Sequence, residues 1–147
     1  MRTHELADFV EVAGRQYCLA SDRIVAVGVP NGANIAASVL LLRPHVLAGA
    51  VLLRAMVPLV PAAKPNLCGG SVLLAAGRRD PTARPDETER LQELLVQAGA
   101  DVMLHWEPAG HGLTPADIAV ARSWLEDRAP ARGDGPRGWA AKENRAN

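Results

Sequence analysis

Residues 23–37 have the sequence RIVAVGVPNGANIAA, and this stretch decides the fold. Its first part, residues 23–29, is a short apolar run rich in valine that follows a turn-forming Ala-Ser-Asp segment, which predicts a buried β-strand closed by Gly28. Alanine, leucine and isoleucine then recur at helical spacing over residues 33–43 until Pro44, which predicts a helix. A strand that turns directly into a helix is typical of a parallel α/β sheet.

The same alternation continues along the rest of the chain. Further strands are predicted at residues 48–54 and 71–77, which are apolar runs, and at residues 101–107, where polar and apolar residues alternate. Helices are predicted at residues 4–12 with Gly14 as the stop, at residues 85–98, and from an N-cap at Thr114 to about Arg128. The prediction is one α/β domain over residues 1–128, with a mostly parallel sheet and helices on both faces. Residues 129–147, rich in Gly, Pro and Arg, are predicted to be a disordered tail.

Composition excludes several classes of protein. The 147 residues are 48% hydrophobic, which argues against a disordered chain. Sixteen basic residues balance sixteen acidic ones, so no net charge favours nucleic acid or anionic lipid. The longest uninterrupted apolar run, residues 46–53, is far shorter than the roughly 18 residues of a membrane span. Residues 1–15 lack the features of a secretory signal, so a cytoplasmic location is expected.

Cysteine and histidine are too few and too dispersed to indicate a metal or cofactor site. Cys18 and Cys68 form no disulfide framework and have no metal-ligand spacing. Neither is expected at the carboxyl ends of the strands, where a parallel α/β sheet binds its ligands. No metal and no cofactor are therefore expected.

Polar residues that carry chemistry follow three of the predicted strands. Residues 28–32, Gly-Val-Pro-Asn-Gly, have the frame of a nucleophile elbow, GxSxG, with Pro30 in the place of the serine. Asp80 follows the third strand and His111 follows the fourth, so the order of nucleophile position, acid and histidine is that of α/β-hydrolases.

With the segments THELADF, RIVAVG, NGANIAAS, LLRAMVPLVP, AAGRRDP and HWEPAGHGLT, the chain resembles the phospholipase/carboxylesterase family of small α/β-hydrolases over most of residues 3–127. The resemblance implies an eight-stranded fold in which the four strands here correspond to strands 5–8. It also implies that the first half of the fold is missing, including the neighbour of strand 23–29 and the loop with the second oxyanion donor. The expected structure is therefore a partial α/β-hydrolase fold.

The resemblance assigns a role to each candidate site residue. Asp80 would orient the imidazole, and His111 would be the general base. The backbone N–H of Asn31 would be an oxyanion-hole donor. The acyl part of an ester substrate would lie against the apolar side chains of Met56, Val57 and Leu59.

The individual residues leave other interpretations open. Taken alone, Asp80 is better explained as a turn-forming residue before a proline, and His111 as a solvated loop histidine. Asn31 is also a common turn or cap residue, and the apolar loop residues are often simple packing. Arg54, at a strand end, either meets an acidic group or keeps its guanidinium in solvent.

Pro30 decides the prediction of activity. Proline has no hydroxyl and no backbone N–H, and its ring holds φ near −65°, so it can supply neither the nucleophile nor the positive φ of an elbow. The residues predict an ordinary turn instead, with Pro30 at its second position and a positive φ at Asn31 or Gly32.

Two functions, and a third possibility that concerns the origin of the sequence, remain open. The first is a serine carboxylesterase or phospholipase by descent, acting on a small-molecule ester, that is inactive or strongly impaired in this chain. The second is a non-catalytic module that self-associates through the unpaired edge of strand 23–29. The third is an internal start at Met1, or a gene remnant.

Overall fold

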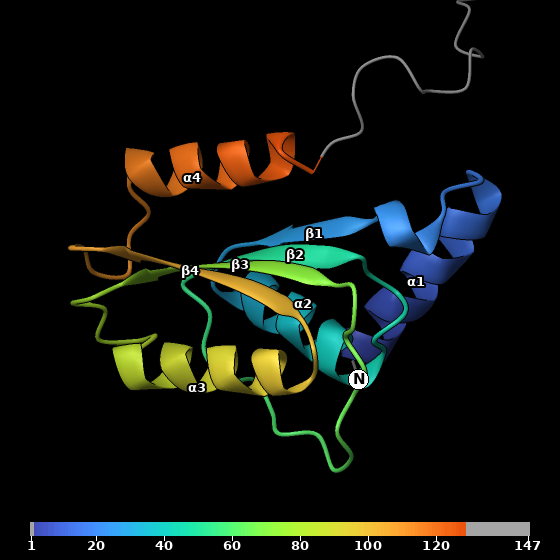
Figure 1. The fold of residues 1–147 in the computed structure, drawn as a ribbon, viewed down its shortest axis with the longest axis horizontal. Helices are drawn as coiled ribbons and strands as arrows, with labels where there is room; N and C mark the ends of the chain where they lie inside the picture. The colour runs from blue at the N-terminus through green and yellow to red at the C-terminus, as the bar shows by residue number, and fades with distance from the viewer. Residues whose placement is uncertain (1, 129–147) are drawn as a thin grey trace, which may run out of the picture.

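The computed structural model describes residues 2–128 as a four-stranded sheet between helices (Figure 1). The strands are β1 (Val25–Gly28), β2 (Gly49–Leu53), β3 (Ser71–Gly77) and β4 (Asp101–Glu107). They pair in the order β1-β2-β3-β4, and every pair is parallel. The predicted α/β class, with a contiguous parallel sheet, is confirmed. The predicted tail, residues 129–147, lies outside the described residues.

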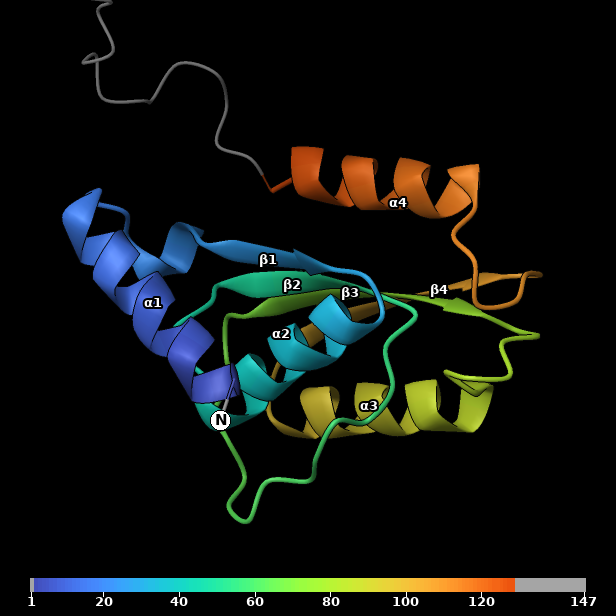
Figure 2. The ribbon, with the colours of Figure 1, turned by 180° about the vertical axis from the view of Figure 1, so that it is seen from behind.

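The helices cover both faces of the sheet. They are α1 (Arg2–Gln16), α2 (Asn31–Leu42), α3 (Pro85–Gln97) and α4 (Pro115–Glu126), with one short 3-10 turn at Ser21–Arg23. Figures 1 and 2 show α2 and α3 under one face and α4 alone over the other. Helix α1 packs against α2 beside the β1 end of the sheet. No helix within residues 2–128 is both long and apolar enough to cross a bilayer.

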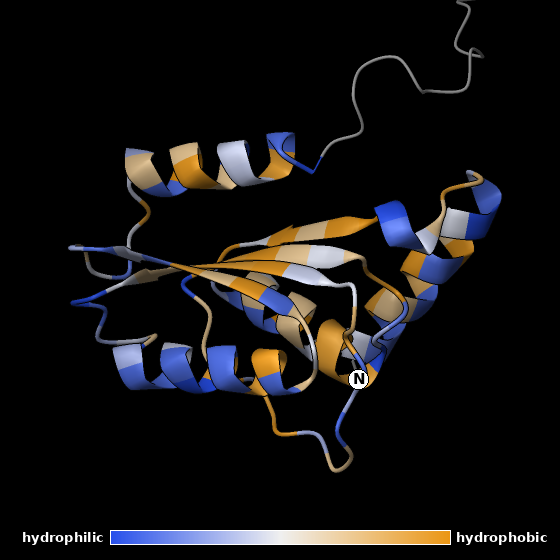
Figure 3. Cartoon of the chain, in the orientation of Figure 1, coloured by the Kyte–Doolittle hydropathy of each residue, from blue (hydrophilic) through white to orange (hydrophobic). Residues whose placement is uncertain are grey.

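The core divides into two parts because successive side chains of a strand point to opposite faces. On β2, Ala50 and Leu52 join the larger cluster with α1, α2 and α3, whereas Val51 and Leu53 join a smaller cluster with Trp124 of α4. All five residues of β2 are buried. Figure 3 shows the strands largely in apolar colours and α3 largely in polar ones. A strand covered on both faces explains the continuous apolar run in the sequence.

The predicted bounds of two elements near the start of the chain are wrong. The first helix does not stop at Gly14 but continues to Gln16, with Gly14 buried inside it. The strand predicted at residues 23–29 is shorter, since Arg23 belongs to the 3-10 turn and only Val25–Gly28 pairs with β2.

Candidate active site

The candidate residues lie beyond the carboxyl ends of the strands, which are all at one end of the sheet because the strands are parallel. Pro30 follows β1, Arg54 follows β2, Asp80 follows β3 and His111 follows β4. The carboxyl ends of parallel strands meet at the same edge, where α/β sheets bind ligands. The structure therefore gathers the four loops that the sequence singles out.

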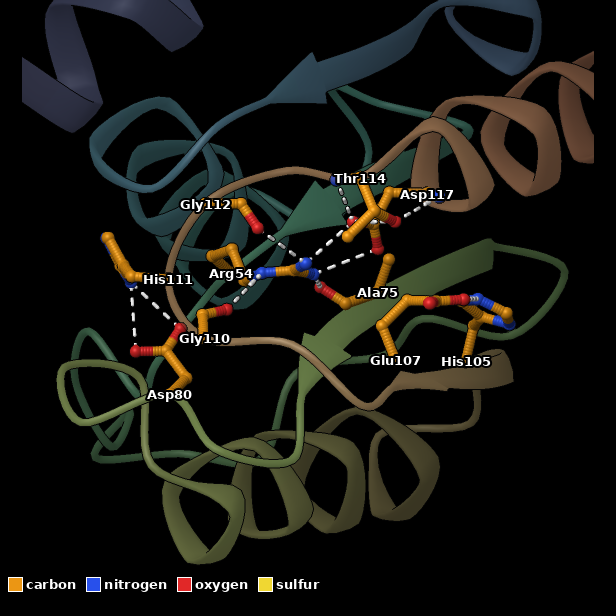
Figure 4. A network of polar contacts seen from close by, with 10 residues as sticks. All are labelled: Arg54, Ala75, Asp80, His105, Glu107, Gly110, His111, Gly112, Thr114 and Asp117. Atoms are coloured by element: carbon orange, nitrogen blue, oxygen red, sulfur yellow. Dashed lines mark hydrogen bonds and ion pairs between the residues drawn. The ribbon is translucent and has the colours of Figure 1, made fainter.

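Asp80 and His111 are in direct contact (Figure 4). Nδ1 of His111 lies 2.8 Å from Oδ2 of Asp80 and 3.0 Å from Oδ1. The Asp80 side chain is completely buried, whereas the His111 side chain is 36% exposed. An aspartate that accepts from Nδ1–H leaves Nε2 as the free basic nitrogen of a neutral imidazole. A buried carboxylate with a half-exposed imidazole is an arrangement able to move a proton at Nε2.

The carboxylate of Asp80 is also held by its own loop. Its Oδ1 accepts the backbone N–H of Thr82 at 2.8 Å and that of Ala83 at 3.0 Å. Burial by itself would raise the pKa of Asp80, but the hydrogen bonds from His111, Thr82 and Ala83 favour the charged form and lower the pKa below its usual value. Asp80 is thus an ionised hydrogen-bond acceptor at neutral pH.

The loop that carries His111 lies against the end of β3. A Cβ on Gly77 would be 2.4 Å from the carbonyl oxygen of Gly110 and 2.6 Å from that of Ala109, so only glycine allows this approach. The backbone N–H of Arg79 donates to the same Ala109 oxygen at 3.0 Å. The close approach brings the loops after β3 and β4 together, and with them Asp80 and His111.

Arg54, which the sequence leaves open, meets an acidic group. Its side chain and that of Asp117 are fully buried and form an ion pair of 2.6 Å between Nη2 and Oδ2. Burial alone would raise the pKa of Asp117, but hydrogen bonds from Arg54 and Thr114 outweigh burial and lower it. Sequence reasoning did not find Asp117, whose only local signal is a capping box with Thr114 at the start of α4.

The turn at Pro30 is not a nucleophile elbow. Gly32 donates its N–H to the carbonyl of Val29 at 2.8 Å, so the predicted turn with Pro30 at its second position is present. Pro30 has φ −18° and ψ −66°. The positive φ expected at Asn31 or Gly32 is wrong, because α2 begins directly at Asn31 and both residues are helical.

The remaining predicted residues lie nearby but in different environments. Asn31 is exposed in the first turn of α2. Met56 donates its backbone N–H to Oδ1 of Asn34 at 3.0 Å, which ties the loop after β2 to α2. Val57 and Leu59 are partly buried and pack against the larger core cluster. No group of three metal-ligating side chains occurs within residues 2–128.

A parallel α/β sheet with an Asp…His pair, in that chain order, beyond its carboxyl ends is the arrangement of α/β-hydrolases. No protein-family model matches the chain. A Bacillus subtilis protein named hydrolase MhqD is 39% identical over 127 residues, which are 86% of this chain and 64% of that protein. A carboxylesterase structure from Bacillus cereus is 44% identical with a TM-score of 0.81, covering 86% of this chain and 59% of that one. A carboxylesterase structure from Mesorhizobium loti is 35% identical with a TM-score of 0.77, covering 84% and 59%.

The chain fits the carboxylesterase/phospholipase-like family of small α/β-hydrolases, as its sequence predicts. It spans somewhat less than two thirds of the length of each of these relatives.

Proposed function

We propose that this chain is a carboxylesterase-type serine hydrolase by descent that retains the acid and the base of a triad and has lost its nucleophile. The observation that carries the proposal is the contact between Asp80 and His111, at the sheet edge where Pro30 also lies. The relatives named as carboxylesterases support a small-molecule ester as the ancestral substrate. The cytoplasmic location and the absence of the first half of the fold remain predictions.

The proposed chemistry requires a hydroxyl that position 30 does not have. In acyl transfer, the histidine takes the proton of the attacking hydroxyl and later gives it to the leaving group, while the aspartate stabilises the imidazolium. His111 and Asp80 fill these two roles in the proposal, with the backbone N–H of Asn31 as an oxyanion donor and Met56, Val57 and Leu59 against the acyl group. Loss of the nucleophile in such a triad costs about 10⁶-fold in kcat.

The test is hydrolysis of short acyl p-nitrophenyl esters by the purified chain. We expect no turnover above a buffer control, and the same result for His111→Ala, because Pro30 offers no nucleophile for His111 to activate. Turnover by the parent chain that disappears in His111→Ala would overturn the proposed inactivity, since it would reveal a nucleophile elsewhere.

Pro30→Ser is the matched variant for this assay. We expect it to recover little activity, because the relatives include over a third of their length that this chain does not cover, and the second oxyanion donor is predicted there. Robust turnover by the isolated Pro30→Ser chain would show that residues 1–147 contain every group the reaction needs.

A second candidate function is a non-catalytic module that self-associates, and the edge strand β1 favours it. Val27 is 58% exposed although it lies in a strand. A hollow of about 340 Å³ beside β1 is lined mostly by apolar side chains of β1, α1 and α2. An apolar strand edge without a partner is a template for strand addition. Analytical ultracentrifugation tests this function: oligomers that Val27→Lys dissociates support it, and a clean monomer that unfolds cooperatively contradicts it.

A further inference from the structure

The backbone carbonyls on both sides of His111 accept hydrogen bonds from one side chain. Nε of Arg54 donates to the oxygen of Gly110 at 3.1 Å, and Nη2 donates to the oxygen of Gly112 at 3.0 Å. Within the described residues, the backbone of residues 110–113 makes no other hydrogen bond. Arg54 is therefore the main polar attachment of the segment that carries His111 (Figure 4).

The guanidinium is itself fixed in place. Nη1 donates to Oδ1 of Asp117 at 2.9 Å and to the carbonyl of Ala75 at 3.2 Å, and Nη2 donates to Oδ2 of Asp117 at 2.6 Å. With the two loop carbonyls, these acceptors match the five N–H donors of arginine, whose directions are set by its planar fork. A lysine has three donors and cannot make the same set.

The backbone of Arg54 is held in a conformation that side chains rarely adopt. Its φ is 58°, in the left-handed region that costs a long side chain free energy. Its N–H donates to the carbonyl of Ala75 at 2.9 Å, which holds this conformation against β3. Such outliers occur where the surrounding structure determines them and often where a site needs them. Here the conformation aims the side chain beneath the His111 loop rather than along β2.

We propose that Arg54, oriented by Asp117, is the positioning residue that sets the His111 loop so that Nδ1 of the imidazole faces Asp80. This inference rests on the Asp80–His111 pair of the proposed function. Without the guanidinium, the carbonyls of Gly110 and Gly112 lose their donors, and the loop stays hydrogen-bonded through its backbone only at Ala109, to the N–H of Arg79. His111 then leaves the buried carboxylate, even though neither histidine nor aspartate has changed.

The experiment reads the tautomer of His111 by long-range ¹H–¹⁵N NMR of the full chain, above the ordinary histidine pKa of about 6.5. The four histidines are assigned by single His→Gln variants. We expect His111 of the parent chain to carry its proton on Nδ1, because Asp80 accepts it. Asp80→Ala removes the acceptor and is the positive control for loss of this tautomer.

The decisive variant is Arg54→Met/Asp117→Leu, which removes both charges and leaves no buried carboxylate unpaired. We expect its His111 to lose the preference for Nδ1–H while the chain stays folded by circular dichroism. Arg54→Lys keeps a cation beside Asp117 but cannot make the same hydrogen bonds, so its His111 should also lose the preference for Nδ1–H. If the double variant does not fold, Arg54→Lys is the variant that tests the positioning role. Arg43→Met is the matched control, since Arg43 is also ion-paired, but with two acidic side chains of α1, Asp8 and Glu11, away from the His111 loop.

The outcomes separate this inference from the proposed function. A folded Arg54 variant whose His111 keeps the parent tautomer overturns the positioning role, and so does a parent chain without the Nδ1–H tautomer. A merely structural role would lower stability without moving the tautomer of the molecules that remain folded. Esterase activity in the parent chain would overturn the proposed inactivity and leave the positioning result standing.

Discussion

The loop that carries His111 and the turn that carries Pro30 lie at the same sheet edge, yet they are built differently. The His111 loop depends on buried polar side chains, because the Arg54–Asp117 pair holds its backbone and Asp80 holds its imidazole. The Pro30 turn depends on backbone alone, with hydrogen bonds from Gly32 to Val29 and from Asn34 to Pro30. We therefore expect the fold of the His111 loop to depend on its side chains more than the fold of the Pro30 turn does.

This difference explains how a site of this kind can keep part of its geometry without its nucleophile. Replacing a member of the buried network leaves a charge or a carbonyl without a partner, which costs free energy of folding whether or not catalysis occurs. Replacing the residue at position 30 removes no such partner. The retained Asp80–His111 contact is thus compatible with an inactive chain.

The largest effect is expected for Arg54→Met, which leaves the buried carboxylate of Asp117 without its cation. Breaking a buried ion pair from one side costs about 3–5 kcal/mol of unfolding free energy. Urea denaturation measures the loss, and Arg43→Met should lose much less because its pair is partly exposed. Equal losses in the two variants would contradict the contrast between a buried and a surface network.

Gly28→Ala tests whether the Pro30 turn is as tightly packed as its backbone geometry indicates. The added Cβ would lie 2.3 Å from the amide nitrogen of Ala33, so backbone must shift at a cost of about 1–3 kcal/mol. Gly32→Ala is the matched control, since no atom lies within 4 Å of its Cβ position. In the first turn of α2, this change should be neutral or stabilise by up to about 1 kcal/mol. Thermal unfolding of the two variants checks the difference.

Acid should destabilise the His111 region through its two buried carboxylates. The folded-state pKa values of Asp80 and Asp117 are lowered, so the unfolded chain binds their protons at higher pH than the folded chain does. Their contribution to stability is complete above the ordinary aspartate pKa of about 3.9, and it is lost as pH falls through the lowered values. Urea denaturation as a function of pH should show a shallower acid loss in Asp80→Asn. If the stability of Asp80→Asn falls with pH as steeply as that of the parent chain, the lowered pKa of Asp80 in the folded chain is contradicted.

The smallest effect is expected for Pro30→Ser. Proline stabilises a chain by restricting its unfolded state where its φ near −65° fits, but Pro30 has φ −18°, so part of that gain is offset and the free energy of unfolding should change by no more than about 1 kcal/mol. Urea denaturation of Pro30→Ser and Arg54→Met in the same assay gives the change in the free energy of unfolding for each of the two regions. A loss of several kcal/mol at position 30 would mean that the ring itself holds the turn, and the contrast drawn above would be wrong.

The sequence by itself determined the class of fold and most of the boundaries. The strands at 71–77 and 101–107 were predicted to the residue, the first from an apolar run that ends at Gly77 and the second from alternating polar and apolar residues. Thr114 was predicted as the N-cap of the last helix, and its capping box is present. The spacing of Pro30, Asp80 and His111 after successive strands also placed them at one edge, since parallel strands share their direction.

Only the tertiary structure decided how those residues are held. Nothing local decides between the two interpretations of Arg54, because its five acceptors come from β3, the His111 loop and α4 and are brought around it only by folding. The end of α1 was also missed, because Gly14 is buried inside the helix instead of ending it. Periodicity and turn residues are local properties of the chain, whereas satisfying a buried charge depends on groups that are distant in sequence.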